Sequence, residues 1–262
     1  MTRFLRDIAV ALALAAVYVV VAWGPAPAHA ATRPSWHTCT RFATRLTGGM
    51  VVDNDHFAGA PGPSCLTVTG HRVTIGTSYQ PAGGVVAYDA IRFGRYPWSD
   101  DPGFGLPAPV TRVATTLHVT ASGGPGRYLY DADVWFSRTA ATGPLNHVRE
   151  MIIATRWQGY SPYCAPRVVK VGRRRWLAGA CMTGPAGHRH LLIRFLAVRQ
   201  SRRSYIDLAA FLTIARRRGW LRKTMTADSV SWAPEVWSGG RGLTYSMSAA
   251  GLPRFQAPKA TS

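Results

Sequence analysis

The chain has 262 residues, of which 31 are lysine or arginine and 12 are aspartate or glutamate, so its formal net charge at pH 7 is +19. A chain of this length fits one all-β sandwich and does not require a second domain. The charge indicates attraction to anionic surfaces such as wall polymers or nucleic acid. The arginines are scattered, however, and no zinc-finger, recognition-helix or RNA-binding aromatic pattern accompanies them, so solvated faces explain the charge better than a specific nucleic-acid site.

The first thirty residues have the pattern of a secretory signal peptide. Two arginines precede an apolar stretch of 16 residues, 8–23, and Ala28-His29-Ala30 then supplies a small-x-small cleavage site. The alternative is a retained membrane anchor, but an anchor needs about 20 apolar residues, and two prolines follow this shorter run. The sequence therefore predicts cleavage after Ala30 and a secreted, monomeric protein with no further contact with a membrane.

Short segments rich in Val, Ile, Tyr and Trp recur between Gly and Pro residues along the rest of the chain, a pattern typical of a sandwich or jelly roll. The expected strands are 48–53, 65–69, 71–77, 87–93, 110–120, 127–137, 147–156, 167–171, 175–182, 189–198, 227–237 and 241–248. One segment, at about 204–218, has helical spacing instead. Ser204 is its candidate N-cap and Gly219 its stop, and the apolar residues between them are Leu208, Phe211, Leu212 and Ala215.

One helix among a dozen strands predicts an all-β fold, a β-jelly-roll sandwich of two antiparallel sheets. We expect the inner sheet to curve into a concave groove and the helix to pack on its convex side. This single domain spans residues 31–252, and residues 253–262, with little apolar content, form a flexible tail.

Four cysteines in an exported protein are most simply two disulfides. The spacing suggests Cys39 with Cys65 and Cys164 with Cys181, while the sequence by itself allows three connectivities.

The chain contains two glutamates in all, Glu150 and Glu235, and each lies in a short apolar segment. A lone glutamate in an apolar strand is usually an edge residue or a salt-bridge partner, because glutamate is rarely buried unpaired. Two such cases favour a site, since two carboxylates that project into one cleft are the minimum requirement for cleaving a glycosidic bond.

Strand alternation gives these glutamates defined neighbours. Val148, Glu150, Ile152 and Ala154 share one face of their expected strand. In the second segment Glu235 shares a face with Ala233 and Trp237. A glutamate beside a tryptophan on an exposed sheet is typical of a sugar-binding surface, because pyranose rings stack on indole.

The motifs around both glutamates resemble one family. The segment Glu235-Val236-Trp237-Ser238-Gly239-Gly240 looks like the acid/base region of glycoside hydrolase family 12, whose members are secreted β-jelly-roll endoglucanases and xyloglucanases. Glu150-Met151-Ile152-Ile153 is similar to the family's nucleophile strand, usually Glu-x-Met-Ile-Trp. Asp133-Val134-Trp135-Phe136 resembles its Asp-Ile-Trp segment.

Two further segments extend the resemblance over roughly residues 37–250 in the right order. Asn54-Asp55-His56-Phe57 stands where the family has Asn-Asn-x-Trp, between the matching cysteines Cys39 and Cys65. The stretch from Tyr88 to Trp98, followed by Leu106-Pro107, resembles the substrate-cleft segment. No single piece is decisive, but all of them are collinear.

The resemblance implies a retaining endo-β-glucanase that cuts β-1,4-linked glucan or xyloglucan and needs neither a metal nor an organic cofactor. Glu150 would be the nucleophile, Glu235 the acid/base and Asp133 the residue that orients the nucleophile. The implied substrate-binding residues are Asn54, Phe57, Trp98 and Trp237. The resemblance also implies the Cys39–Cys65 disulfide, and Cys164–Cys181 then follows by elimination and from an expected hairpin.

Three departures from the family pattern concern the cleft. Ile152 replaces a methionine, Ala154 replaces a tryptophan and Phe57 replaces another aromatic residue, so we expect less stacking surface and an altered substrate choice. We interpret Asp131 as structural, and His188 and His190 as a surface turn and not a metal site.

Two other functions remain alternatives. One is a non-catalytic, lectin-like sandwich of the same fold. The other is a protein that adheres to anionic wall polymer through its arginines.

Overall fold

The computed structural model describes residues 35–47, 50–57, 64–81, 83–95, 106–138, 147–160, 164, 167–184 and 189–250. The expected signal peptide, Trp98, His188 and the expected tail lie outside these ranges. Within them, no helix is long and apolar enough to cross a membrane.

Strict alternation of side chains explains how the central strands form a two-layered structure. In β9 (Gly126–Ser137), Tyr128, Tyr130, Ala132, Val134 and Phe136 all belong to the main hydrophobic core. The residues between them, among them Asp131, Asp133 and Trp135, therefore point to the opposite face of the sheet.

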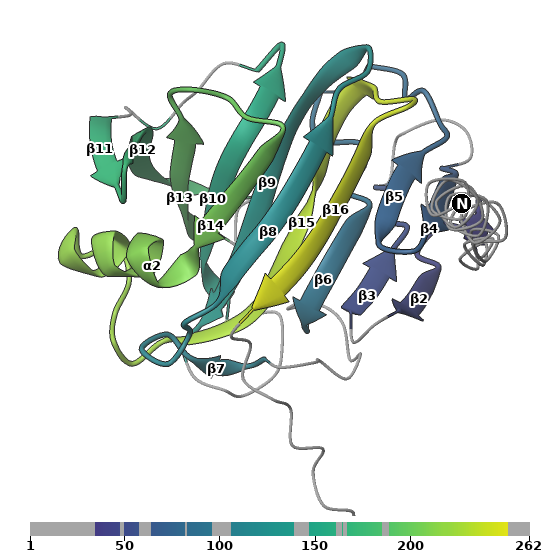
Figure 1. Ribbon diagram of the computed structural model, residues 1–262. Coiled ribbons are helices and arrows are strands. Elements are labelled where there is room, and N and C mark those ends of the chain that lie inside the picture. The colour runs from purple at the N-terminus through teal and green to yellow at the C-terminus, as the bar shows by residue number, and fades with distance from the viewer. Residues whose placement is uncertain are drawn as a thin grey trace, which may run out of the picture. The chain divides into compact units, whose positions relative to one another are not determined.

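The strands form two sheets, with the smaller one in front of the larger one in Figure 1. The six-stranded sheet has the order β1 (Ser35–Thr38), β4 (Leu66–Thr69), β5 (Arg72–Ile75), β16 (Thr244–Ala250), β8 (Thr116–Ser122) and β14 (Arg203–Asp207). The ten-stranded sheet has the order β11 (Arg167–Val171), β12 (Arg174–Thr183), β13 (His190–Ala197), β10 (His147–Gln158), β9, β15 (Thr226–Gly239), β6 (Ala90–Gly94), β3 (Met50–Asp53) and β2 (Thr44–Thr47), with β7 (Ala108–Pro109) paired to β15. The predicted all-β sandwich is confirmed.

The prediction of purely antiparallel sheets was wrong at one pair of strands. β10 and β13 run parallel, with Glu150 opposite Leu192. The reason is the path of the chain between β10 and β13. β11 pairs antiparallel with β12, and β12 pairs antiparallel with β13, so β13 runs in the same direction as β11. β13 then lies beside β10 and runs parallel to it. Parallel neighbours need such a crossover, and here a hairpin takes the place of the usual helix.

The helix α2 (Leu208–Arg217) is shorter than predicted, because the segment before it is a strand. Ser204 and Ile206 are buried while Arg203, Tyr205 and Asp207 are exposed, which is the alternation of a strand, and β14 pairs with β8. Ser204 is therefore not the N-cap. Asp207 caps the helix through Oδ1, which accepts a hydrogen bond from the Ala210 N–H at 3.3 Å.

Helix α2 packs on the core face of the ten-stranded sheet. The Phe211 ring lies 4.8 Å from the Trp176 ring and 5.0 Å from the Phe195 ring, measured between centroids. Both ring partners belong to the main hydrophobic core. The residue next to Phe195, Leu196, belongs instead to the apolar cluster on the opposite face of the sheet. The helix thus supports the sheet from behind the surface that carries the two glutamates.

Both predicted disulfides are present, Cys39–Cys65 and Cys164–Cys181. The first ties the end of β1 to the start of β4. The second ties the connection after β10 to the middle of β12. Sequence reasoning missed the short strands β1, β2 and β14, whose segments are only four or five residues long.

Candidate active site

Both glutamates lie on one face of the ten-stranded sheet, and β9 between them sets the register. Glu150 of β10 is opposite Trp135 of β9, and Glu235 of β15 is opposite Leu129 of β9. Trp135 and Leu129 occupy alternate positions of β9, and directly paired residues share a face. We call this surface, with Asp131, Asp133, Glu150 and Glu235, the carboxylate face.

The nucleophile candidate Glu150 has a partner that sequence reasoning missed. His190 is the first residue of β13, and its Nε2 lies 2.7 Å from Oε2 of Glu150. The two side chains are only 15% and 13% exposed. An ionised carboxylate only accepts hydrogen bonds, so Nε2 carries the proton and donates it. The interpretation of His190 as a surface turn was wrong, because the parallel register of β13 brings it beside β10.

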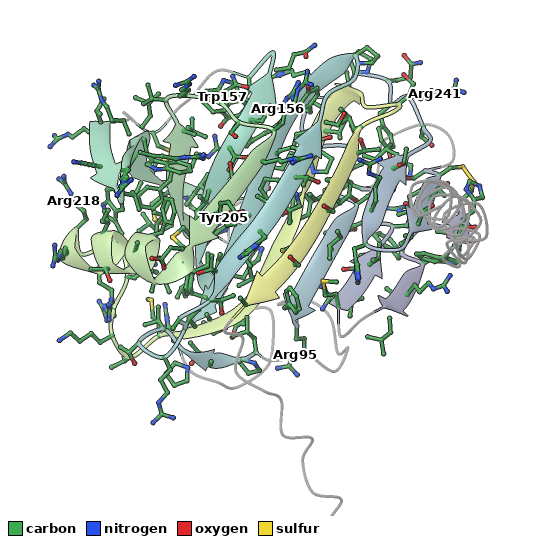
Figure 2. All side chains as sticks on the ribbon, in the orientation of Figure 1. Arg95, Arg156, Trp157, Tyr205, Arg218 and Arg241 are labelled. Carbon is green, nitrogen blue, oxygen red and sulfur yellow. A yellow bond between two sulfur atoms is a disulfide. The ribbon has the colours of Figure 1, made fainter. Side chains whose placement is uncertain are left out.

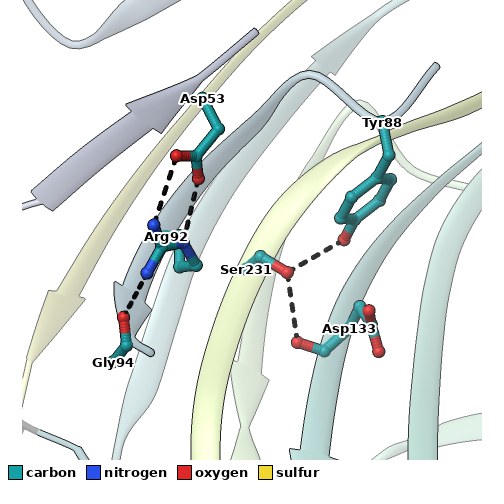
Figure 3. A network of polar contacts seen from close by, with 6 residues as sticks. All are labelled: Asp53, Tyr88, Arg92, Gly94, Asp133 and Ser231. Atoms are coloured by element: carbon teal, nitrogen blue, oxygen red, sulfur yellow. Dashed lines mark hydrogen bonds and ion pairs between the residues drawn. The ribbon is translucent and has the colours of Figure 1, made fainter. Parts of the chain in front are cut away.

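A tryptophan joins this histidine to Asp133. The Trp135 ring packs on the His190 imidazole with centroids 5.1 Å apart, and Trp135 Nε1 donates a hydrogen bond of 2.7 Å to Asp133 Oδ2. Ser231 of β15 links Asp133 to a neighbouring tyrosine. Its Oγ donates to the Asp133 backbone carbonyl at 3.4 Å and lies 3.2 Å from the Tyr88 hydroxyl (Figure 3). Residues of four strands thus hold the nucleophile side of the carboxylate face.

The second glutamate has the properties of a general acid. The pKa of Glu235 is raised to about 7, mainly by burial and then by the charge of Glu150, while the charge of Arg194 opposes both effects. Its Oε2 is buried and has no hydrogen-bond partner within the described parts of the chain. Burial is therefore a larger cause of this pKa shift than the neighbouring charge of Glu150.

The two aspartates on this face hold protons more tightly than ordinary aspartates. Burial raises the pKa of Asp131, followed by the charges of Glu235 and Asp133. Burial also raises the pKa of Asp133, followed by the charges of Glu150 and Glu235. In both aspartates the charges of other carboxylates on the same face add to the effect of burial, as expected of groups that share one site.

Aromatic side chains surround the Glu235 end of the face. Trp237 has its ring centroid 5.4 Å from that of Tyr160, and the Arg127 guanidinium lies 5.4 Å from the Trp237 ring. Trp157, Tyr160 and Trp237 all pack against the apolar cluster that includes Ala154. They supply stacking surface near the position where Ala154 replaces the family's tryptophan.

The predicted substrate-binding residues have different surroundings. Phe57 packs against Tyr88, Ala90 and Ala233, and therefore lies on the carboxylate face beside Glu235. Trp237 lies on the same face, whereas Trp98 is outside the described residues.

Asn54 is the exception, because it is fully buried. Its Nδ2 donates to the carbonyls of Thr40 and Ser64 at 2.8 and 2.9 Å, and its Oδ1 accepts from the Ser64 hydroxyl at 2.8 Å. These bonds use the whole amide, so Asn54 supports the chain next to the first disulfide and does not reach the surface.

A second buried polar network lies at the β3 and β6 side of the same sheet. Arg92 donates two hydrogen bonds to Asp53, at 2.9 and 3.2 Å, and a third to the carbonyl of Gly94 at 2.5 Å (Figure 3). Burial raises the pKa of Asp55 to about 7 and that of Asp89 to about 8. The Tyr79 hydroxyl donates to Asp89 at 3.0 Å.

Among the described residues, one group of potential metal ligands comes together, His37, Cys39 and Cys65. The two sulfur atoms are joined in a disulfide, so they are not thiolate ligands.

These buried carboxyl groups predict how stability depends on pH. In the folded protein, Asp55 and Asp89 have pKa values of about 7 and about 8 and hold their protons below these pH values. In the unfolded chain an aspartate has a pKa of 3.8 and is already ionised above about pH 4. The folded protein therefore binds more protons between about pH 4 and pH 8, and the free energy of unfolding falls as the pH rises through this range. We expect calorimetry to give a melting temperature on the order of 10 °C higher at pH 5 than at pH 8.

The variant Asp89→Asn tests the origin of this slope, because its amide oxygen still accepts the hydrogen bond from Tyr79. Its melting temperature is expected to change less between pH 5 and pH 8 than that of the wild type. The exposed Asp207 supplies the control Asp207→Asn, which keeps an N-cap oxygen for helix α2 and should keep the slope. A melting temperature that rises from pH 5 to pH 8 would contradict this account.

Comparison with solved structures decides the fold. Endoglucanase Cel12A from Rhodothermus marinus is 24% identical, with a TM-score of 0.73 over 82% of this chain and 98% of that chain. A family 12 xyloglucanase from Bacillus licheniformis is 15% identical, with a TM-score of 0.72 over 82% of this chain and 99% of that one. The chain has the fold of the family 12 glycoside hydrolases.

The family 12 fold also occurs in the xyloglucanase domain of NopAA, a type three effector from Sinorhizobium fredii, whose structure contains cellobiose. It is 18% identical to this chain, with a TM-score of 0.63 and coverage of 82% and 98%. No protein-family model matches the sequence, and no curated protein is significantly similar to it. The resemblance inferred from scattered motifs is thus confirmed for the family 12 fold.

Proposed function

We propose that the protein is a secreted, retaining endo-β-glucanase that hydrolyses β-1,4-linked glucan or xyloglucan. The observation that carries this proposal is the carboxylate face, on which Glu150 and Glu235 share one side of the sheet and the charge of Glu150 helps to raise the pKa of Glu235. Solved structures with this fold include endoglucanases and xyloglucanases. The signal-peptide pattern of residues 1–30 supports export, and residues 31–252 would form the mature catalytic domain.

Glu150 is the proposed nucleophile. Its carboxylate attacks the anomeric carbon, the bond from that carbon to the leaving oxygen breaks, and a covalent glycosyl-enzyme forms. The hydrogen bond from His190 fixes one carboxylate oxygen, which leaves the other free to attack.

Glu235 is the proposed acid and base. With a pKa of about 7 it carries a proton in mildly acidic solution and gives that proton to the leaving oxygen. In the second step it takes a proton from a water molecule, which attacks the anomeric carbon and releases Glu150. Its buried position keeps the proton in place until a substrate arrives.

Asp133 is the proposed orienting residue. Burial and the charge of Glu150 raise its pKa, which favours a protonated carboxyl beside the ionised nucleophile. Oδ2 of Asp133 accepts a hydrogen bond from Trp135 Nε1, and Oδ1 of Asp133 has no hydrogen-bond partner among the described residues. A proton on Oδ1 is therefore available for a hydrogen bond toward Glu150.

A product profile on a panel of glucans tests the proposal. Purified protein should release oligosaccharides of several lengths from xyloglucan, carboxymethylcellulose or mixed-linkage glucan, because an endo-enzyme cuts within the chain. If correctly folded protein binds glucan and releases no sugar from any of these polymers or from aryl β-glycosides, the lectin-like alternative replaces this proposal.

Replacing His190 tests its role as a positioning residue. His190→Ala is expected to lower kcat by about 10- to 100-fold, the worth of one hydrogen bond to a charged group, with little change in KM. His190→Gln should recover part of the loss, because its amide nitrogen donates at a similar position. Kinetics and thermal melts of both variants check this, and equal kcat values for the alanine, glutamine and wild-type enzymes would show that the contact is not used.

A further inference from the structure

Acidic and basic side chains are segregated in this protein. Asp207 is the one exposed carboxylate within the described ranges, and it caps helix α2. Both glutamates are half-buried, and six aspartates are buried, namely Asp53, Asp55, Asp89, Asp131, Asp133 and Asp228. Arginines make up 28 of the 31 basic residues. Among the described arginines, Arg92 and Arg194 are buried, and many of the others project outward, as Arg95, Arg218 and Arg241 do in Figure 2. Within the described parts of the chain, exposed carboxylates other than Asp207 are therefore not available to neutralise the positive charge of the surface.

Five of these arginines line a single hollow of about 680 Å³. Arg173, Arg174 and Arg175 come from the turn between β11 and β12 and its continuation into β12. Arg199 and Arg202 come from the connection between β13 and β14. No acidic or aromatic residue lines the hollow.

The backbone holds these two segments together. The Val198 N–H donates to the Arg175 carbonyl at 3.0 Å, and the Ala121 N–H donates to the Arg202 carbonyl at 2.8 Å. Arg174 itself donates to the hydroxyl of Ser204 at 3.0 Å. The arginines are thus presented by a fixed scaffold, which lowers the entropy cost of binding a ligand.

Such a cluster repels itself unless an anion binds to it. Guanidinium groups suit carboxylate and phosphate oxygens, because their planar N–H groups match both in a bidentate way. Sites for single-stranded nucleic acid add aromatic side chains on which bases stack, and the hollow has none. The absence of aromatic residues disfavours single-stranded nucleic acid, and five guanidinium groups spread over one hollow suit a polymer whose anionic groups repeat along its length.

The hollow is separate from the carboxylate face. His190, which contacts Glu150, is the first residue of β13, and the connection that carries Arg199 and Arg202 follows its last residue, Ala197. Eight strand residues span about 25 Å. A polymer bound at the hollow would therefore leave Glu150 accessible. The hollow lies nearer to the aromatic end of the carboxylate face, because the Trp157 N–H donates a hydrogen bond of 3.0 Å to Oε1 of Gln200, which lines the hollow.

We propose that the arginine hollow is a binding site for an anionic glycan chain, one that carries repeated carboxylate or phosphodiester groups. It holds the protein on an anionic matrix while the carboxylate face remains open to a neutral glucan. Binding is electrostatic and weakens as salt screens the charges.

Matched variants separate this site from the overall charge. In one, Arg173, Arg175, Arg199 and Arg202 are all replaced by glutamine, and Arg174 is kept for its bond to Ser204. In the control, four exposed arginines elsewhere are replaced instead, Arg72, Arg112, Arg218 and Arg241. Both variants lose the same charge.

The measurement is calorimetric titration of the full chain with polygalacturonate and with poly(glycerol phosphate), at low and at physiological salt. The variant that lacks four arginines of the hollow is expected to bind at least one polymer about 30-fold or more weakly than the wild type. The control variant should bind the same polymer less than about 3-fold more weakly. The two polymers distinguish carboxylate from phosphodiester recognition. Circular dichroism verifies that both variants are folded.

Three results would overturn the proposal. These are equal losses in the two variants, unchanged affinity in the hollow variant, and binding of duplex or single-stranded DNA in preference to both glycans. Hydrolysis of neutral glucan is measured separately and should be the same in all three proteins. Since the titration does not depend on turnover, a protein that binds the polyanion and cuts no glucan would contradict the proposed enzyme activity while supporting this site.

Discussion

Replacing Glu150 with glutamine is expected to lower turnover of any glucan that the wild type cuts by about 10⁵-fold or more. A neutral amide cannot form the glycosyl ester. Glutamine has almost the same shape as glutamate and can still accept the hydrogen bond from His190. Substrate affinity and the melting temperature should therefore change little.

Steady-state kinetics on the best polymer of the panel, with binding measured by titration, check this expectation. The matched control is Asp207→Asn, which removes an exposed carboxylate far from the sheet face that carries Glu150. Residual activity of Glu150→Gln above about one per cent of wild type would assign the nucleophile to another residue, because nucleophile loss costs orders of magnitude more.

Replacing Glu235 with alanine should have a different signature. The loss on glucan is expected to be about 10²- to 10⁴-fold, the usual contribution of a general acid and base. Aryl glycosides with good leaving groups need no proton, so the glycosylation step should be largely retained on them. Added azide should restore the second step by replacing the water that Glu235 activates, with a glycosyl azide as the product.

The same variant identifies the group behind the pH dependence. With a pKa of about 7, Glu235 loses its proton as the pH rises through neutrality. Wild-type activity on glucan should therefore fall above about pH 7, and Glu235→Ala acting on an activated aryl glycoside should lack this alkaline limb. An alkaline limb that persists unchanged in the variant would assign it to a different group.

Local sequence pattern was sufficient to predict much of the candidate site. Alternation in β9 and β10 placed Asp133 and Glu150 on defined faces of their strands. Successive side chains of a strand point to opposite faces, so this assignment does not require the identity of the neighbouring strand. It also placed Glu235 beside Trp237. The fold class followed from the number and spacing of such segments.

Features that depend on pairing over long distances were not predictable in this way. His190 reaches Glu150 from a strand 40 residues later, through the one parallel pair. The residues next to it in the chain, Arg189 before it and Leu191 after it, do not indicate a carboxylate partner. The residues opposite His190 can be identified only when the order of β10 to β13 in the sheet is known.

The wrong assignments have the same cause. Asn54 matched a family motif, yet its side chain is held by hydrogen bonds to Ser64, ten residues later, and to Thr40, fourteen residues earlier. Ser204 has a good N-cap side chain, but pairing of its segment with β8 extends the strand to Asp207. Tertiary pairing overrode a local preference in both cases.

The most direct test of the account is covalent trapping. A 2-deoxy-2-fluoro aryl β-cellobioside slows the second step more than the first, so a retaining enzyme should accumulate the glycosyl-enzyme. Mass spectrometry of the peptides should then find one sugar ester on Glu150, and Glu150→Gln should remain unlabelled. A wild-type protein that hydrolyses glucan but carries no label, or carries it on another residue, would contradict the assignment of Glu150 as the nucleophile of a retaining pair.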